Sequence, residues 1–514
     1  MNVYDTTVYF IKTSEVYGTI QCQDFDTIVA LREYFSFFAD GYQFQPSFIN
    51  LQWDGKIRLI DASNQIRLGL WHEVKSFCER YNLPFMLDPK IQRFSLDKKK
   101  FEGFVENLDV HAGGDSITPY DYQVDAAHHA LESQRCLLLS PTSSGKSLIQ
   151  YMLIRMYEKI LPDQKMLIIV PTVGLVTQMQ GDFNDYSSNI EWDAESSIHG
   201  IKAGVCKDTN KHIVVSTYQS LIRVDVSFFH QFSAIMCDEV HTATAKSITR
   251  ILDNGVNASW RVGLTGTLDE CKTNKLILTG MFGPVYTVIS TKELMDSGQV
   301  AQLKVNVALL KHNEKDCKFM RSAPRGPIEE STGKKKRVKA TYKEEIDFII
   351  SSEARNKFIM NFTAKLKGNS ILMINIVEHG ENLFKWMKAA FPDREIYLYT
   401  GATKADEREE IRQLMEKSEN AIIIGSLGVL STGISIKRLH NLVFAHPSKS
   451  RVKVLQSVGR LLRLSKFGNL VHMFDMVDDF LIGAYENYTY GHGQKRVSFY
   501  HDQQFDTEVF KVTL

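Results

Sequence analysis

Cysteine is scarce and scattered in this chain of 514 residues. The seven cysteines include no Cys-x-x-Cys pair, and even the two nearest ones, Cys206 and Cys237, lie far apart in the sequence. An odd number of widely spaced cysteines indicates neither a zinc site nor a disulfide framework. We therefore exclude a small disulfide-rich scaffold and expect a reducing compartment.

Long hydrophobic runs are also missing. The longest uncharged stretch, residues 420–436, is interrupted by Gly425, Gly428 and Gly433, whereas a membrane-spanning helix needs about 20 apolar residues. The first residues include Asp5 and lack the basic-then-apolar order of a signal peptide. We therefore expect a soluble protein of the cytoplasm, with no membrane partner.

Neither sign of charge is in excess. The chain has 61 Lys and Arg against 60 Asp and Glu, which gives a formal net charge of +1. The overall charge therefore does not indicate a nucleic-acid partner, and any basic surface must be a local patch. Hydrophobic residues make up 44% and charged residues 24% of the chain, which excludes a disordered protein. At roughly 150 residues per domain, we expect about three domains.

Short apolar runs alternate with helical stretches in two parts of the chain. The runs are Cys136–Leu139, Met166–Val170, Ile213–Val215, Ala234–Cys237 and Arg261–Leu264 in the first part, and Ile371–Ile376, Glu395–Leu398, Ala421–Gly425, Leu442–Phe444 and His472–Phe474 in the second. This alternation is typical of a parallel sheet with helices on both faces. We predict an α/β fold with two doubly wound parallel-sheet domains, at residues 111–290 and 291–514.

Residues 1–110 have a different pattern, which predicts a small N-terminal α+β module. Asp54-Gly55 indicates a hairpin turn, and the alternation after it places Lys56 and Arg58 on one face of a strand. Trp53, just before the turn, has two open interpretations. It braces the hairpin as a core residue, or it is a platform on which a DNA base stacks.

The strongest local motif is the loop Leu139–Ser147, which follows an apolar run and opens a predicted helix. Phosphate groups bind where backbone N–H groups converge at a helix N-terminus. Lys146 would reach the β and γ phosphates of ATP, and the Ser147 hydroxyl would bind magnesium. The general pattern has a glycine where Ser140 stands. The loop residues that we predict to contact ATP are Thr142, Ser143, Ser144, Gly145, Lys146 and Ser147.

A second motif, Asp238-Glu239-Val240-His241, directly follows the apolar run that ends at Cys237. In P-loop ATPases an acid at such a strand end holds magnesium. Glu239 beside it would then orient or deprotonate the attacking water. A single acid here would more often be a solvent-exposed strand end, but the phosphate loop upstream favours an ATPase site.

A third motif, Gln456–Arg463, lies on a predicted helix of the second domain. Arg460 and Arg463 are three positions apart and therefore share a helical face. Arginines from a neighbouring domain can neutralise charge that develops on the γ-phosphate. Surface arginines are common, so only the ATPase site upstream favours this role.

The motifs occur in the order found in superfamily-two helicases, between residues 120 and 465. They are Tyr122-Gln123, the phosphate loop, Pro171-Thr172, Ser216-Thr217-Tyr218-Gln219, Asp238–His241, Thr265-Gly266-Thr267, Ser431-Thr432-Gly433 and Gln456–Arg463. The Asp-Glu-x-His box with Thr-Gly-Thr is more similar to DNA translocases than to RNA helicases. Phe35–Tyr42, Trp53–Leu59 and Ser431–Ser435 resemble the UvsW recombination helicases of tailed phages.

This resemblance implies two RecA-like lobes and an ATP- and magnesium-dependent enzyme. It implies 3′-to-5′ remodelling of branched DNA (forks, Holliday junctions, displacement loops, and RNA–DNA hybrids in R-loops) in phage recombination, repair and replication. The implied protein is a monomer in the host-cell cytoplasm, with other recombination proteins as possible partners.

The resemblance also implies a role for each motif residue. Gln123 would read the adenine edge. The residues for catalysis are Lys146, Asp238, Glu239, Gln456, Arg460 and Arg463, with Ser147 and Asp238 on magnesium. The residues that would couple ATP to DNA are His241, Thr265, Gly266, Thr267, Thr432 and Gly433. The residues that it implies for DNA contact are Thr172, Thr217 and Gln219, and the hairpin pattern itself adds Trp53, Lys56 and Arg58 as candidates.

Other functions stay open. A double-strand DNA translocase would move without separating strands, an ATP-gated protein would only anneal or bridge DNA, and an RNA helicase would respond to RNA. Residues 311–345 contain the basic run Lys334–Lys339. We expect a polar loop there, with a solvated charge run favoured over a nucleic-acid contact.

Overall fold

The structure is a computed structural model of the whole chain. It describes residues 5–39, 41–91, 94–202, 204–242, 245–268, 272–328, 335–426, 436, 438–447, 459 and 470–514. The chain forms two compact units, Met1–Ile289 and Ser290–Leu514.

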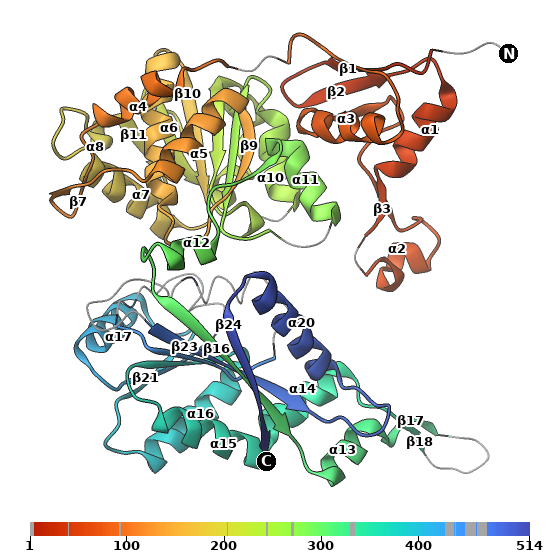
Figure 1. The fold of residues 1–514 in the computed structure, drawn as a ribbon, viewed down its shortest axis with the longest axis vertical. Coiled ribbons are helices and arrows are strands. Elements are labelled where there is room, and N and C mark those ends of the chain that lie inside the picture. Colours follow the sequence, from red (N-terminus) through yellow and green to blue (C-terminus); the bar gives the residue numbers. More distant parts are fainter. Residues whose placement is uncertain are drawn as a thin grey trace. The chain divides into compact units, whose positions relative to one another are not determined.

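The first unit contains a seven-stranded sheet in which all neighbouring strands run parallel (Figure 1). Its strand order is β11-β12-β10-β13-β14-β9-β15. The strands are β9 Arg135–Leu139, β10 Lys165–Val170, β11 Ile198–Ile201, β12 Ile213–Thr217, β13 Phe232–Cys237, β14 Trp260–Thr265 and β15 Val285–Thr287. The main helices are α4 Lys98–Glu106, α5 Asp121–Ser133, α6 Lys146–Ile160, α7 Val173–Tyr186, α10 Ala245–Asn254 and α11 Lys272–Phe282.

Side chains of this sheet alternate between two hydrophobic cores. In β10, Met166 and Ile168 belong to the core shared with α4, α5, α6 and α7, whereas Leu167 and Ile169 belong to the core shared with α10 and α11. Successive residues of a strand point to opposite faces, so a continuous apolar run is required when both faces are covered. The predicted doubly wound domain is confirmed.

The N-terminal module has its own four-stranded sheet of order β5-β2-β1-β6. Its elements are β1 Val8–Lys12, β2 Tyr17–Gln21, α1 Phe25–Tyr34, β5 Gln65–Arg67, η2 Leu68–Leu70, α3 Trp71–Arg80 and β6 Phe85–Leu87. A second, two-stranded ribbon pairs β3 Ser36–Phe38 with β4 Lys56–Arg58 and carries η1 Tyr42–Phe44 and α2 Pro46–Ile49 (Figure 1). The predicted tight hairpin at Asp54-Gly55 is therefore wrong, because residues 39–55 form a longer excursion between these strands.

The module packs directly on the first sheet domain. Arg67 pairs with Asp253 at 3.0 Å (Nη2–Oδ2) and Arg135 pairs with Glu15 at 2.9 Å (Nη2–Oε2). Gly69 in η2 faces the C-terminal turn of α11 so closely that a Cβ there would lie 2.3 Å from the carbonyl oxygen of Thr279. The module and the first sheet domain consequently form one compact unit.

The second unit contains another parallel seven-stranded sheet, of order β20-β21-β19-β22-β23-β16-β24 (Figure 1). The strands are β16 Gln302–Lys311, β19 Ser370–Ile374, β20 Ile396–Tyr399, β21 Ile422–Ser426, β22 Asn441–Phe444, β23 Leu470–Asp479 and β24 Asp506–Thr513. The helices include α12 Thr291–Asp296, α13 Glu314–Arg321, α14 Tyr342–Ser351, α15 Glu353–Lys365, α16 Val377–Ala390, α17 Ala405–Lys417 and α20 Tyr488–Asp502. One face packs on α15 and α16, and α20 packs against β23 and β24.

The prediction of a polar loop is wrong for the described part of residues 311–345. Residues 311–328 and 335–345 form α13, the antiparallel pair of β17 Ala323–Ile328 with β18 Lys335–Val338, and the start of α14, whereas Lys334 of the predicted basic run lies outside the described residues. Cys317, Met320 and Ala340 are buried against Ile349 and Phe480. These few apolar residues anchor the segment, and they are too widely spaced among charges to reveal a regular pattern. Among the residues that the structure describes, no helix is both long and apolar enough to span a membrane.

The close approach at Gly69 predicts a stability effect. Gly69→Ala should lower the free energy of unfolding of the first unit by about 1–3 kcal/mol, because the new methyl group cannot fit against Thr279 without a backbone shift. The matched control is Gly103→Ala in α4, where a Cβ meets nothing within 4 Å, and a helical alanine should stabilise by about 0.5–1 kcal/mol. Urea unfolding of both variants measures the difference, and equal midpoints would contradict the packing described.

Candidate active site

The phosphate loop joins β9 to α6 at the carboxyl edge of the first sheet. Gly145 caps α6 with φ +79° and with no side-chain hydrogen bond to the first turn. A Cβ on Gly145 would lie 2.1 Å from Gln123 Nε2, so both the backbone angle and the space require glycine. The uncapped N–H groups of α6 are the donors that an anion such as phosphate needs.

Serine replaces the usual glycine of this motif without strain. Ser140 is fully buried, and its Oγ lies 2.6 Å from Ser144 Oγ. Ser144 Oγ in turn donates to the carbonyl of Pro141 at 2.6 Å. The two hydroxyls therefore close the loop internally, and the Ser144 side chain is used within the protein. Thr142 is half-buried and Ser143 exposed.

The side chain of Gln123 stabilises the phosphate loop by a hydrogen bond. Its Nε2 donates to the Ser144 carbonyl at 2.9 Å, and its Oε1 accepts from the Tyr120 N–H at 2.9 Å. The side chain is 4% exposed. In the structure Gln123 thus joins the start of α5 to the phosphate loop, and its contact with adenine stays a prediction.

The two acids lie beside the loop lysine, because β13 and β9 both flank β14. Lys146 Nζ is 3.2 Å from Glu239 Oε1 and donates to the Ser140 carbonyl at 3.3 Å. Glu239 has φ +46°, a strained left-handed conformation that non-glycine residues seldom adopt. Its N–H donates to Asp238 Oδ1 at 2.9 Å. The sequence motifs at 146 and 238–239 therefore form one cluster.

The carboxyl groups of this cluster titrate differently. Burial and the charge of Glu239 raise the pKa of Asp238 above its usual value. Burial also acts to raise the pKa of Glu239, but Lys146 and His241 outweigh it, and the pKa of Glu239 is lowered. Glu239 is therefore ionised at neutral pH and able to accept a proton from water.

His241 connects this cluster to Thr265. Its Nδ1 lies 2.7 Å from Thr265 Oγ1, and Thr265 Oγ1 donates to the Thr267 carbonyl at 2.7 Å. Because the threonine hydrogen is used there, His241 must donate from Nδ1. Burial lowers the pKa of His241, which favours the neutral ring. Gly266 lies over the loop, since a Cβ there would be 3.6 Å from Lys146 Nζ.

Two residues of α7 complete the site without any sequence signal. Tyr186 OH lies 2.9 Å from Ser147 Oγ. Asp182, one turn earlier on α7, has its pKa raised by burial, while the nearby Ser147 acts to lower it. Their position depends on the packing of α7 against α6, which no local motif encodes.

The oxygen atoms here fit magnesium. Ser147 supplies a hydroxyl and Asp238, which is half-buried, supplies a carboxylate, both of which are hard ligands. Within the described ranges, no group of three or more His, Cys, Asp or Glu could hold a metal ion. Magnesium typically uses one or two protein ligands together with substrate phosphates and water, so this sparse set suits a nucleotide-bound ion.

The residues predicted to contact the DNA backbone lie at or just after the carboxyl ends of two neighbouring strands. β10 and β12 pair with Val170 opposite Thr217. Thr172 is exposed and its Oγ1 accepts from the Leu175 N–H, which caps α7. Thr217 is 3% exposed and caps the short helix Tyr218–Leu221, whereas Gln219 is exposed. Of these, Thr172 and Gln219 are accessible at the sheet edge.

The predicted DNA residues of the module are all engaged within it. Trp53 is half-buried, and its Nε1 donates to the Lys56 carbonyl at 3.0 Å. Lys56 pairs with Glu33, and Arg58 pairs with Asp54. Neither cation is available to phosphate without giving up a carboxylate. Gln456, Arg460, Arg463, Thr432 and Gly433 lie outside the described residues.

Three segments match known families. Residues 5–88 match "DNA helicase UvsW, N-terminal", residues 116–270 match "Type III restriction enzyme, res subunit", and residues 333–465 match "Helicase conserved C-terminal domain". The ATP-dependent DNA helicase uvsW of Enterobacteria phage T4 is 35% identical over 99% of this chain and 100% of its own length. The chain belongs to the UvsW family of helicases.

Further relatives agree with this family. The crystal structure of T4 UvsW matches with 32% identity, a TM-score of 0.52, and 99% of both chains covered. The DNA 3′-5′ translocase XPB2 of Sulfurisphaera tokodaii is 22% identical over 73% of this chain and 85% of its own length. Three predictions are thereby confirmed for this chain: membership of the UvsW family, an α/β fold with two RecA-like lobes, and a helicase enzyme.

The contact between Ser147 and Tyr186 generates a prediction. Tyr186→Phe should raise the magnesium concentration needed for half-maximal binding of a fluorescent ATP analogue by about 2- to 10-fold, the effect of losing one hydrogen bond. Binding without magnesium should not change. Tyr157→Phe is the control, since it removes a fully buried hydroxyl elsewhere on α6. Equal magnesium dependence in both variants would show that Tyr186 does not orient Ser147.

Proposed function

We propose that this chain hydrolyses ATP with magnesium and uses the energy to remodel branched DNA. The observation that carries the proposal is the cluster of Lys146, Glu239, His241 and Thr265, which joins the phosphate loop, the acidic box and the Thr-Gly-Thr turn through contacts of 2.7–3.4 Å. The name of the T4 relative supports the use of ATP and DNA.

In the proposed reaction, the N–H groups of α6 and Lys146 bind the phosphates. Ser147 and Asp238 would hold magnesium, which would supply positive charge against the transferred phosphoryl group. The ionised Glu239 orients the attacking water and accepts its proton. Withdrawal of Lys146 from Glu239 toward the phosphates would leave that carboxylate free for water.

Coupling to DNA is proposed to run through His241 and Thr265. A movement of Glu239 would shift His241 and its hydrogen bond to Thr265. Thr265 is the last residue of β14, so the shift would reach the carboxyl edge of the sheet. There Thr172, Thr217 and Gln219 are proposed to contact backbone phosphates, which sets position without reading sequence. Gln123 would contact adenine.

The second lobe is proposed to supply the remaining parts. Gln456, Arg460 and Arg463 would complete the ATP site, and Thr432 with Gly433 would couple it to DNA. The proposed domains are the N-terminal DNA-binding module at residues 1–110 and the two lobes at residues 111–290 and 291–514.

Branched DNA is the proposed substrate because the exchange of base pairs at a branch point costs little net free energy. Opening one base-pair step costs on average about 1.4 kcal/mol, whereas branch migration replaces each broken pair with a new one. Forks, Holliday junctions and displacement loops share this feature, and so do R-loops with their RNA–DNA hybrids. A 3′-to-5′ direction, action in phage recombination, and a monomer in the host cytoplasm belong to the same proposal.

A double-strand DNA translocase is the second candidate. The match of residues 116–270 to a restriction-enzyme subunit and the relative named as a translocase favour it. A translocase would be stimulated by linear duplex without separating its strands.

Steady-state ATP hydrolysis with a four-way junction, linear duplex, single-stranded DNA and single-stranded RNA tests the proposal. We expect the junction to stimulate hydrolysis most, and Glu239→Gln to lower kcat by about 100-fold or more, as for loss of a general base. Glu195→Gln, an exposed acid of the same unit, is the control.

Each of the other outcomes would contradict a different part of the proposed function. Stimulation by linear duplex alone supports the translocase, and stimulation by RNA alone excludes DNA as the substrate. Hydrolysis unaffected by Glu239→Gln removes the proposed base.

A further inference from the structure

The described residues between β3 and β4 form a structural element, which we call the arm (residues 39 and 41–55). The Ala39 N–H donates to the Gly55 carbonyl at 2.8 Å and closes its base. The Tyr42 ring stacks on Phe38 with centroids 4.6 Å apart and meets Phe48 edge-on at 4.8 Å. A Cβ on Gly55 would lie 2.4 Å from the Tyr42 ring. The arm thus has a small aromatic core of its own.

Outside this core, the arm presents three apolar side chains to solvent, which we call the apolar tip. Phe44 is 82%, Ile49 63% and Leu51 91% exposed. Single exposed apolar residues are ordinary, but several gathered on one projecting element mark a binding surface. Figure 1 shows the arm reaching away from the sheet of the module. The apolar tip is therefore a candidate binding surface for an apolar group.

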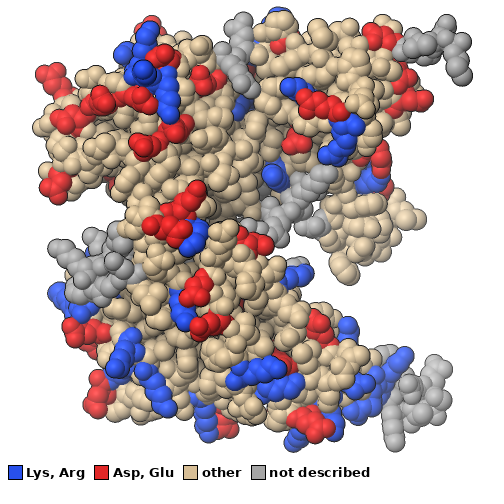
Figure 2. Space-filling model, in the orientation of Figure 1, with Lys and Arg blue, Asp and Glu red and all other residues tan. Residues whose placement is uncertain are grey.

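The surroundings of the apolar tip are neutral. Residues 41–53 contain no charged residue, and the projecting end of the arm is tan in Figure 2. The polar side chains that share it are exposed amides: Gln43, Gln45, Asn50 and Gln52. Phosphate binding needs cations, whereas bases offer apolar faces and hydrogen-bonding edges. The composition of the arm thus matches bases rather than backbone.

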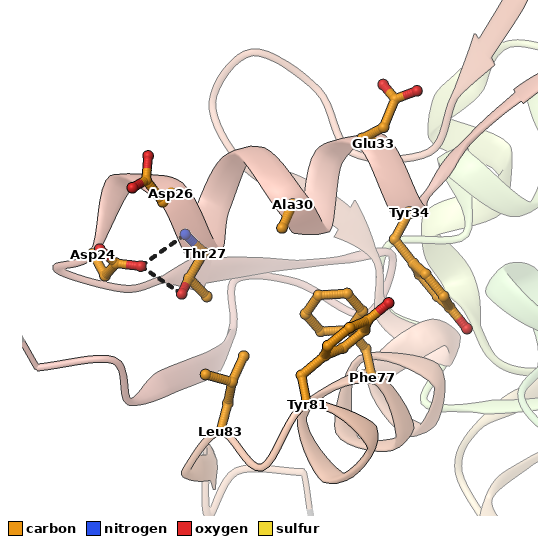
Figure 3. Close-up of a pocket in the computed structure, with 9 residues that line it drawn as sticks. All are labelled: Asp24, Asp26, Thr27, Ala30, Glu33, Tyr34, Phe77, Tyr81 and Leu83. Atoms are coloured by element: carbon orange, nitrogen blue, oxygen red, sulfur yellow. Dashed lines mark hydrogen bonds between the residues drawn. The ribbon is translucent and has the colours of Figure 1, made fainter.

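The described pocket in the body of the module is less suited to DNA than the apolar tip. A pocket of about 560 Å³ lies between α1 and α3, and Figure 3 shows its aromatic wall of Tyr34, Phe77 and Tyr81. Asp24 and Asp26 stand at the start of α1, so the pocket rim is acidic. Asp24 accepts from Thr27 at 2.8 Å and caps the helix. Carboxylates there would repel phosphates.

We propose that the apolar tip binds the exposed base faces at a DNA branch point, with Phe44 stacked on the last base pair and Leu51 and Ile49 wedged beside it. Base faces are covered by stacking within a duplex and become accessible where strands part. Apolar wedges of Phe, Leu and Ile between base steps are a known means of holding distorted DNA. This inference rests on the proposed function and adds the element that recognises the branch.

Binding to three DNAs tests the apolar tip: a four-way junction, linear duplex of equal length and single-stranded DNA. Phe44→Ala, alone and with Leu51→Ala, should weaken junction binding about 10-fold, within the range for one stacked base. Affinity for linear duplex and hydrolysis in the absence of DNA should not change. Phe44→Trp should retain junction affinity. The control is Phe25→Ala, since Phe25 is 72% exposed on α1 of the same module.

A second readout reports the contact itself. 2-Aminopurine at the branch point should brighten when the wild type binds, because wedging unstacks it, and brighten less with Phe44→Ala. Unchanged junction affinity and unchanged fluorescence in the variants would overturn the inference. So would a fall in oligomer size by analytical ultracentrifugation, which would show that a second copy covers the tip. If the wild type itself shows no junction preference, the proposed function fails instead.

Discussion

The parallel pairing of β13, β14 and β9 is the constraint on which the candidate site depends. Cys237 pairs opposite Gly263, and Thr265 pairs opposite Leu139, so the three following segments leave the sheet at the same edge. A strand advances about 3.3 Å per residue and alternates its faces. A slip of one residue would therefore separate Glu239 from Lys146 and turn the side chains to the wrong face. Burial on both sides of the sheet fixes this register.

The same constraint explains which parts of the candidate site can be predicted from the sequence. Apolar runs predict strands, and motifs directly after them predict side chains at the carboxyl edge, because both are local patterns. The phosphate loop and the acidic box can therefore be predicted from the sequence. Tyr186 and the Ser140–Ser144 contact depend on packing, and no local pattern encodes them. The cap of α20 is similar: the Thr489 N–H donates at 2.7 Å to Glu345, 144 residues away.

The N-terminal module shows a second kind of limit. Its family is readable from short stretches, but its attachment to the sheet domain depends on ion pairs and on one glycine contact. Arg67, Glu15 and Gly69 meet partners far away in sequence. The partner of Gly69 is α11, the helix that follows the Thr265–Thr267 turn. A displacement of that turn during the ATP cycle would therefore act on the helix that carries the module.

The charged residues and the neutral residues of the module differ in how they can contact DNA. Lys56 and Arg58 are paired with carboxylates, and the arm between them and β3 is neutral over residues 41–53. Attraction to phosphate depends on counterion release and weakens steeply with salt, whereas stacking on a neutral surface releases no counterions. The contribution of the apolar tip should therefore persist at salt concentrations that weaken contacts to the backbone. Preference for branches over duplex should then increase with salt, as suits the proposed remodelling of branched DNA.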